Sequence, residues 1–212
     1  MSATTHPKSA PRLFTLNEAA VLTQMPLKAV HNAIDKKTIA LATGDRAGHA
    51  TRLLDSRALM SLALERRLTD RVAPDLRREI FAALTDTRLS TVSVEGGLIE
   101  IDLREPRKAL ARSIRDLRRA RGMVHSDPDI KGGAPVFKGT RIQVHMIAEL
   151  VARGSSPREL LEDYPRMTAE MLRLTPIYAA AYPLRGRPRR QPWHDRPPVR
   201  TEHVKWADLE AT

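Results

Sequence analysis

The stretch Ser126–Pro165 constrains the fold most, because it places four of the chain's ten glycines and four of its fifteen prolines between two helical patterns. Glycine reaches backbone conformations that a Cβ atom disfavours, whereas proline fixes φ and pushes the preceding residue toward extended geometry. Between these residues the apolar pair Val136-Phe137 predicts a short strand, with a tight turn at Lys138-Gly139. The stretch therefore predicts a strand and a turn that lead into helices.

Three helices are predicted after that turn. The first has an apolar face formed by Ile147, Leu150 and Val151, and it ends at Gly154. Ser156 begins the second helix as an N-cap, with Glu159 at the capping-box position, and Thr168 caps the third. Pro176 is expected to kink the third helix or to end it early. Helices separated by short turns in this order are typical of a helix-turn-helix unit.

The motifs of this stretch, in the order DP, GG, P, GTR, VH, G, SPxEL and DYP, closely resemble a small bacterial helix-turn-helix domain long catalogued as a domain of unknown function. The segment also resembles the antitoxin side of VapBC-like toxin–antitoxin pairs, whose toxin is a PIN-domain ribonuclease. The resemblance covers roughly residues 126–188 and includes the motif Arg185-Gly186-Arg187-Pro188. It implies an antitoxin that inhibits such a ribonuclease and binds operator DNA to repress its own transcription.

The composition favours an anionic partner. The formal net charge is +11 and the pI is near 10.6, and because the basic residues cluster, a nucleic acid is the expected partner; the alternative is a solvated basic surface. Cysteine is absent, which excludes disulfides and thiolate metal sites. No apolar run approaches the length of a membrane span and the first residues lack a hydrophobic signal region, so we expect a cytoplasmic protein without membrane contact.

A second helix-turn-helix pattern occupies the N-terminal part. Thr15 and Glu18 form a capping-box pattern before a short helix, and Pro26 starts a second helix at Leu27–Lys36. A hairpin-like segment follows, with strands at Ile39–Ala42 and Thr51–Leu54 around a turn at Gly44–Gly48, and Asp55 then caps a further helix. This order over residues 14–64 resembles the winged helix-turn-helix domains of the MerR and excisionase group.

That resemblance implies that the second helix enters the major groove of DNA. Val30 and Ile34 would face inward, and the polar residues off that stripe would meet base edges or phosphates. The predicted DNA-binding residues are Lys28, His31, Asn32 and Lys36 on the helix and Arg46 and Arg52 on the wing. The alternative is that these side chains form the ordinary polar face of a packing domain.

The middle of the chain predicts a helix, a hairpin and a strongly basic helix. The hairpin has strands at Thr91–Val94 and Leu98–Leu103, and we expect it to pair with another edge, either Val136-Phe137 or the same hairpin in a second copy. The basic helix should open at Pro106 and bury Leu110, Ile114 and Leu117. Its surface carries seven cations against one anion, which are Arg107, Lys108, Arg112, Arg115, Arg118, Arg119 and Arg121 against Asp116. We expect Arg115 and Arg118 to contact phosphates, the alternative being a solvated face.

The tail from Pro183 onward is rich in proline and arginine and cannot form a packed core. PIN-like ribonucleases hold a metal with carboxylates, and guanidinium groups bind carboxylates in a planar, bidentate way. The expected toxin-binding residues are Arg185, Arg187, Arg189, Arg190 and Trp193. The alternative is a stand-alone transcriptional regulator, because Arg-Gly-Arg-Pro is also the core of AT-hook-like minor-groove binders.

The predicted fold class is therefore mainly α with small β-hairpins (α+β). The expected parts are a disordered arm at 1–12, a MerR-like domain at 13–68, a linker region at 69–122, a C-terminal helix-turn-helix domain at 123–182 and an extended tail at 183–212. No phosphate loop, nucleophile elbow or metal-ligand spacing is present, so we predict no enzymatic activity, no cofactor and no metal. We expect a homodimer or a larger hetero-oligomer with a PIN-domain ribonuclease toxin and operator DNA as partners.

Overall fold

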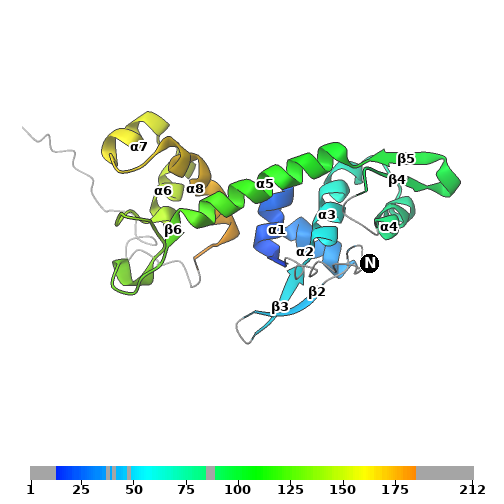
Figure 1. The fold of residues 1–212 in the computed structure, drawn as a ribbon, viewed down its shortest axis with the longest axis horizontal. Helices are drawn as coiled ribbons and strands as arrows, with labels where there is room; N and C mark the ends of the chain where they lie inside the picture. Colours follow the sequence, from blue (N-terminus) through cyan, green and yellow to red (C-terminus); the bar gives the residue numbers. More distant parts are fainter. Residues whose placement is uncertain (1–12, 37–38, 40–41, 47–48, 85–88, 185–212) are drawn as a thin grey trace, which may run out of the picture.

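The computed structural model describes residues 13–36, 39, 42–46, 49–84 and 89–184 of the 212-residue chain. The predicted arm at 1–12 and the tail from residue 185 lie outside the described residues. The described part is mainly helical with three small antiparallel sheets, which confirms the α+β class. Figure 1 shows two groups of helices joined by one long helix, α5 (Arg104–Gly122).

The N-terminal module begins as the sequence predicts. Its elements are β1 (Phe14–Thr15), α1 (Leu16–Thr23), α2 (Leu27–Asp35), β2 (Ala42–Arg46), β3 (His49–Leu54) and α3 (Ser56–Leu68). The capping box before α1 is confirmed: the Glu18 amide donates to the Thr15 hydroxyl at 3.2 Å, and the Thr15 amide donates to the Glu18 carboxylate at 2.8 Å. Asp55 caps α3 by accepting from the Ala58 amide at 2.8 Å.

The hairpin of this module differs from the prediction. β2 starts at Ala42 instead of Ile39 and runs through Gly44, and Arg46 pairs with His49, so only residues 47–48 separate the strands. The predicted turn at Gly44–Gly48 was therefore too wide, because glycine was taken as a turn signal where the backbone continues to pair. β1 adds an unpredicted third strand in the order β1-β3-β2, and it is too short to show alternation.

The middle region forms α4 (Pro74–Ala83), β4 (Thr91–Val94), a 3-10 turn (Glu95–Gly97), β5 (Ile99–Asp102) and α5. The predicted hairpin is confirmed, but its pairing with Val136-Phe137 is wrong, because the described part gives this sheet only β4 and β5. The reason is that α4 packs on β4 and helps to bury Val92 and Val94, so the apolar face of the hairpin is covered without a further strand. α5 begins two residues before Pro106, which is tolerated because first-turn amides have no intrahelical acceptor.

The C-terminal module consists of β6 (Val124–His125), a 3-10 turn (Lys131–Gly133), β7 (Val136–Phe137), α6 (Val144–Ala152), α7 (Pro157–Asp163) and α8 (Ala169–Ala181). β7 pairs with β6. The helix signals are confirmed: Gly154 has φ +93° after the end of α6, Ser156 and Glu159 form a capping box, and Thr168 caps α8.

Pro176 was predicted to kink α8 or to end it early, and the early end is wrong, because the helix continues to Ala181. A proline inside a helix costs about 3 kcal/mol, since it removes one hydrogen bond and crowds the preceding turn. Tertiary packing offsets this cost: α8 packs on α1, α5 and α6, and it buries Leu172 and Leu174. Tertiary contacts that sequence propensity does not contain therefore decide the length of this helix.

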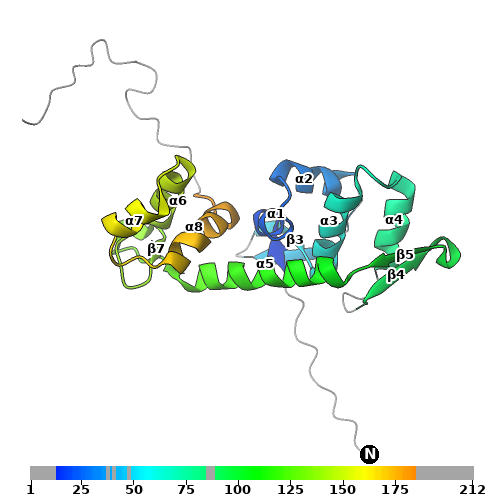
Figure 2. The same ribbon diagram turned by 90° about the horizontal axis from the view of Figure 1, so that it is seen from above.

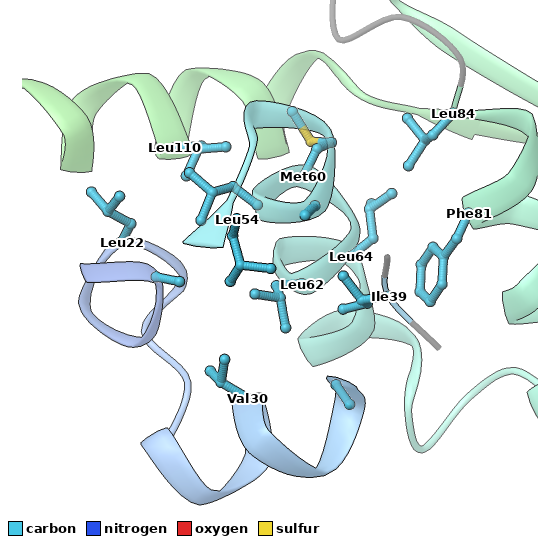
Figure 3. Close-up of a cluster of buried hydrophobic side chains, with 14 of the residues drawn as sticks. Leu22, Val30, Ile39, Leu54, Met60, Leu62, Leu64, Phe81, Leu84 and Leu110 are labelled. Atoms are coloured by element: carbon cyan, nitrogen blue, oxygen red, sulfur yellow. The ribbon is translucent and has the colours of Figure 1, made fainter. Parts of the chain in front are cut away.

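Two hydrophobic clusters stabilise the fold. The larger one extends from the N-terminal module through α4, the hairpin and α5 to Ala181 at the end of α8. Figure 3 shows part of it, with labelled side chains from several elements converging: Leu22, Val30, Ile39, Leu54, Met60, Leu62, Leu64, Phe81, Leu84 and Leu110. The smaller cluster lies within the C-terminal module and centres on Phe137, Val144 and Ile147. The long helix α5 and the end of α8 thus tie the N-terminal module to the rest of the chain.

Candidate nucleic-acid interface

Helix α2 exposes the residues that the sequence predicts to contact DNA. Val30 and Ile34 are buried, as expected, so the opposite side of the helix faces solvent. Lys28, Asn32 and Lys36 are exposed on that side, whereas His31 is half-buried. The exposed face therefore offers two ammonium groups and one amide, which are side chains that hydrogen-bond to phosphates and to base edges.

The turn between α1 and α2 is held from two sides. Gln24 ends α1 in the left-handed conformation with φ 55° and ψ 35°, and its amide donates to carbonyls of the preceding turn. Arg66 of α3 donates to the Gln24 side-chain oxygen at 2.8 Å. Pro26 then opens α2. Because the turn is short and braced by α3, the direction of α2 relative to α1 is fixed.

Of the two predicted wing residues, the structure describes the side chain of Arg52 but not that of Arg46. Arg52 in β3 pairs with Asp35 at the end of α2 with an N–O distance of 3.1 Å. Both side chains are more than half exposed, at 55% and 60%, so this ion pair contributes little stability and leaves Arg52 available to a phosphate. Arg46 lies in β2 opposite His49, and its side chain lies outside what the structure describes.

His31 and Arg52 also line a groove of about 700 Å³ with the end of α8 and the start of the tail. Its other lining residues are Thr15, Leu16, Asn17, Leu27, Ala181, Tyr182, Pro183 and Leu184. No pattern in the sequence predicts this juxtaposition, because the two sides of the groove are formed by residues far apart in the chain. Pro183 and Leu184, the last residues that the structure describes, therefore lie beside α2.

A partly buried hydrogen-bond network joins the end of α8 to α1 and α6 at that point. The Tyr182 hydroxyl donates to the buried Glu18 carboxylate at 2.6 Å, and His145 Nε2 lies 2.8 Å from the Tyr182 carbonyl oxygen. A carbonyl only accepts, so His145 Nε2 carries the proton in this contact. The Tyr178 ring lies 4.9 Å from that of Tyr182, and burial raises the pKa of the Tyr178 phenol while Arg121 acts in the opposite direction. Sequence reasoning missed Glu18 and Tyr182, since the capping box alone explains a glutamate at position 18.

Arg115 and Arg118 lie apart from α2. They are exposed on α5, and α1 and α3 separate that helix from α2, which Figure 2 shows at the opposite edge of the module. The structure thus divides the predicted DNA-binding residues between two surfaces, α2 with the β2–β3 hairpin and the outer face of α5. The predicted toxin-binding residues lie outside the described residues: Arg185, Arg187, Arg189, Arg190 and Trp193.

The described residues contain no cluster of three histidine or acidic side chains that could hold a metal ion. Within the same residues, no helix is both long enough and apolar enough to cross a membrane.

At the hairpin end of α5, Arg104 hydrogen-bonds to Asp102 and lowers the pKa of that carboxyl to about 2. This exposed pair ties the start of α5 to β5.

Comparison with known proteins gives the family. An uncharacterized protein of Sinorhizobium fredii (strain NBRC 101917 / NGR234), called y4eO, is 33% identical over 202 residues, which cover 87% of this chain and 88% of that protein. The chain belongs to the y4eO family. A family model described as "Protein of unknown function (DUF433)" matches residues 124–179 of this chain. The matched segment therefore coincides with the C-terminal module. A crystal structure of Rv2018 from Mycobacterium tuberculosis is 17% identical with a TM-score of 0.30, covering 76% of this chain and 96% of that one.

Proposed function

We propose that this protein is a DNA-binding antitoxin whose N-terminal module acts as a winged helix-turn-helix reader of its operator. The DNA-binding part is supported by the exposure of Lys28 and Asn32 on α2, and of Lys36 at its C-cap, opposite the buried face of this short helix. A helix that presents amides and cations, and whose axis is fixed by a preceding helix, is suited to the major groove. The β2–β3 hairpin would follow the adjacent backbone as the wing.

The charge of the chain supports this proposal. Each lysine or arginine that neutralises a phosphate releases condensed counterions, so a basic surface raises affinity for any duplex. Specificity then depends on the side chains that reach base edges. Asn32 is the best placed of these by chemistry, because an amide can make a bidentate pair with adenine worth about 1–3 kcal/mol. Lys28 and Lys36 would set the position of α2 on the backbone.

The antitoxin part of the proposal depends on the resemblance of the C-terminal motifs to VapBC-like antitoxins. In this proposal the C-terminal module is a helix-turn-helix domain formed by α6, α7 and α8, and the arginines that follow Leu184 inhibit a PIN-domain ribonuclease. Guanidinium groups suit the carboxylate cluster of such an enzyme. Losing one buried charge-paired arginine should weaken the complex by about 2–5 kcal/mol.

The test is a chain truncated after Pro183, assayed for ribonuclease inhibition and for operator binding. The ribonuclease for this assay is to be obtained by expressing the neighbouring reading frames together with the full chain and isolating a small acidic protein that co-purifies with it. We expect the truncated chain to bind DNA and to fail to inhibit. A truncated chain that still inhibits the ribonuclease would refute the tail mechanism. One that loses DNA binding as well would favour the alternative, a stand-alone regulator with an AT-hook-like tail.

A further inference from the structure

The outer face of α5 carries a row of exposed basic residues. Leu110, Leu117 and Ala120 bury the inner face of this helix. The opposite face carries five exposed cations, which are Lys108, Arg112, Arg115, Arg118 and Arg119. Figure 2 shows both modules on one side of α5, so the outer face lies uncovered along the described part of the molecule.

These cations are largely uncompensated. Lys108 pairs with Glu105 at 2.9 Å and Arg119 with Glu170 at 3.2 Å, and both pairs are well exposed and therefore weak. Within the described residues Arg112, Arg115 and Arg118 form no ion pair or hydrogen bond. A helix face with several unpaired guanidinium groups in solvent repels itself and attracts a polyanion.

We propose that this face binds the phosphate backbone of a second DNA duplex, separate from the one that α2 reads. A straight duplex lying against the exposed face of α2 cannot also lie against the outer face of α5, because α1 and α3 stand between them. The row of cations extends about 16 Å along the helix axis from Lys108 through Arg112 to Arg119, at 1.5 Å per residue. That length runs beside about five phosphates of one strand, which are spaced 3.4 Å apart along the axis.

The chemistry of the face favours duplex DNA over other polyanions. Single-stranded nucleic acid is held by aromatic stacking, and residues 104–122 contain no aromatic side chain. A protein partner needs an apolar centre in its interface, and none of the large apolar side chains exposed on the described surface belongs to α5. The remaining fit is a sequence-independent contact with a phosphate backbone. This inference rests on the proposed binding of DNA by the α2 surface, but not on recognition of a particular operator by α2.

The experiment is a bridging assay with the full chain. A random-sequence 30-base-pair duplex is immobilised on beads, the protein is added, and capture of a second, fluorescent duplex of the same length is measured. The test variant is Arg112→Gln with Arg115→Gln and Arg118→Gln. The matched control is Arg67→Gln with Arg71→Gln and Arg78→Gln, three exposed arginines on or near α3 and α4. Both variants lower the formal charge by three, from +11 to +8.

We expect the wild-type chain and the control to capture the second duplex and the α5 variant to lose at least nine-tenths of that capture. In anisotropy titrations over a salt series, the slope for the α5 variant should be shallower by about 2–3 than for the control, since each lost phosphate contact removes about 0.9. Equal capture by the two variants, or no capture by the wild-type chain, would overturn the proposal. So would a tenfold preference for an RNA duplex. If the double variant Lys28→Ala with Asn32→Ala loses operator specificity while bridging persists, both proposals stand. If the wild-type chain bridges duplexes without any operator specificity, only the proposed reading of the operator is rejected.

Discussion

The hydrogen bond between Tyr182 and Glu18 joins the two ends of the described chain, and removing it should weaken that joint measurably. The substitution Tyr182→Phe deletes the hydroxyl and keeps the ring, whose centroid lies 4.9 Å from that of the tilted Tyr178 ring. The Glu18 side chain is buried, with the residue 4% exposed, and it accepts this bond at 2.6 Å. Hydrogen bonds to a charged group contribute about 1.5–3 kcal/mol net, so deleting the Tyr182 hydroxyl should lower the free energy of unfolding by about that much.

Urea unfolding followed by circular dichroism provides the assay. With an m value of about 2 kcal/mol per molar urea, a loss of 1.5–3 kcal/mol lowers the midpoint by about 1 M. Tyr164→Phe is the matched control, because within the described residues the Tyr164 hydroxyl makes no hydrogen bond, and its loss should change the free energy of unfolding by less than about 0.5 kcal/mol. If Tyr182→Phe unfolds at the same urea concentration as Tyr164→Phe, the joint does not contribute to stability and the reasoning is refuted.

Three further predictions concern other parts of the molecule. Arg104 lowers the pKa of the Asp102 carboxyl from 3.8 to about 2, so the ionised carboxylate should stabilise the fold above about pH 4 and lose that effect as the pH falls to about 2. In Asp102→Asn this part of the acid dependence of the melting temperature should be absent, and an NMR titration should place the wild-type carboxyl near 2. Pro176→Ala restores an amide donor for the Leu172 carbonyl and should raise the free energy of unfolding by about 1–3 kcal/mol in urea titrations, an unchanged midpoint contradicting this account of the helix. Light scattering should find a dimer or larger species, in which Leu98 at the hairpin tip, 88% exposed, contributes apolar surface to the contact. A 23.7 kDa monomer at micromolar concentration would contradict this prediction.

The local signals in the sequence predicted the helices well, because a helix terminus is decided by residues within one turn of it. The capping boxes at Thr15 and Ser156 and the glycine after α6 are examples. The register of the β2–β3 hairpin was less predictable, since glycine signals a turn and is also tolerated inside a paired strand. The continuation of α8 past Pro176 is decided by packing against α1 and α5, which no local pattern contains.

The site was predictable in its residues and less so in its geometry. The exposure of Lys28 and Asn32 follows from the periodicity of α2, and the structure agrees. The separation of α2 from α5 does not follow from any spacing, because it depends on how α1 and α3 pack between them. The contact of Tyr182 with Glu18 joins residues 164 positions apart and leaves no local trace. It also means that deleting the N-terminal module would remove part of the larger hydrophobic cluster, so point variants test that module better than truncation does.

The most direct test of the central claim is the affinity of Lys28→Ala with Asn32→Ala for operator DNA. Overlapping 40-base-pair duplexes from upstream of the coding region identify the operator by anisotropy with the wild-type chain, and a scrambled duplex measures non-specific binding. The account predicts that the double variant binds the operator about 5–150-fold more weakly, which corresponds to 1–3 kcal/mol, and the scrambled duplex only a few-fold more weakly. Arg78→Ala, an exposed arginine on α4, should behave as wild type. Unchanged operator affinity in the double variant, with its fold intact by circular dichroism, would contradict reading of the operator by α2.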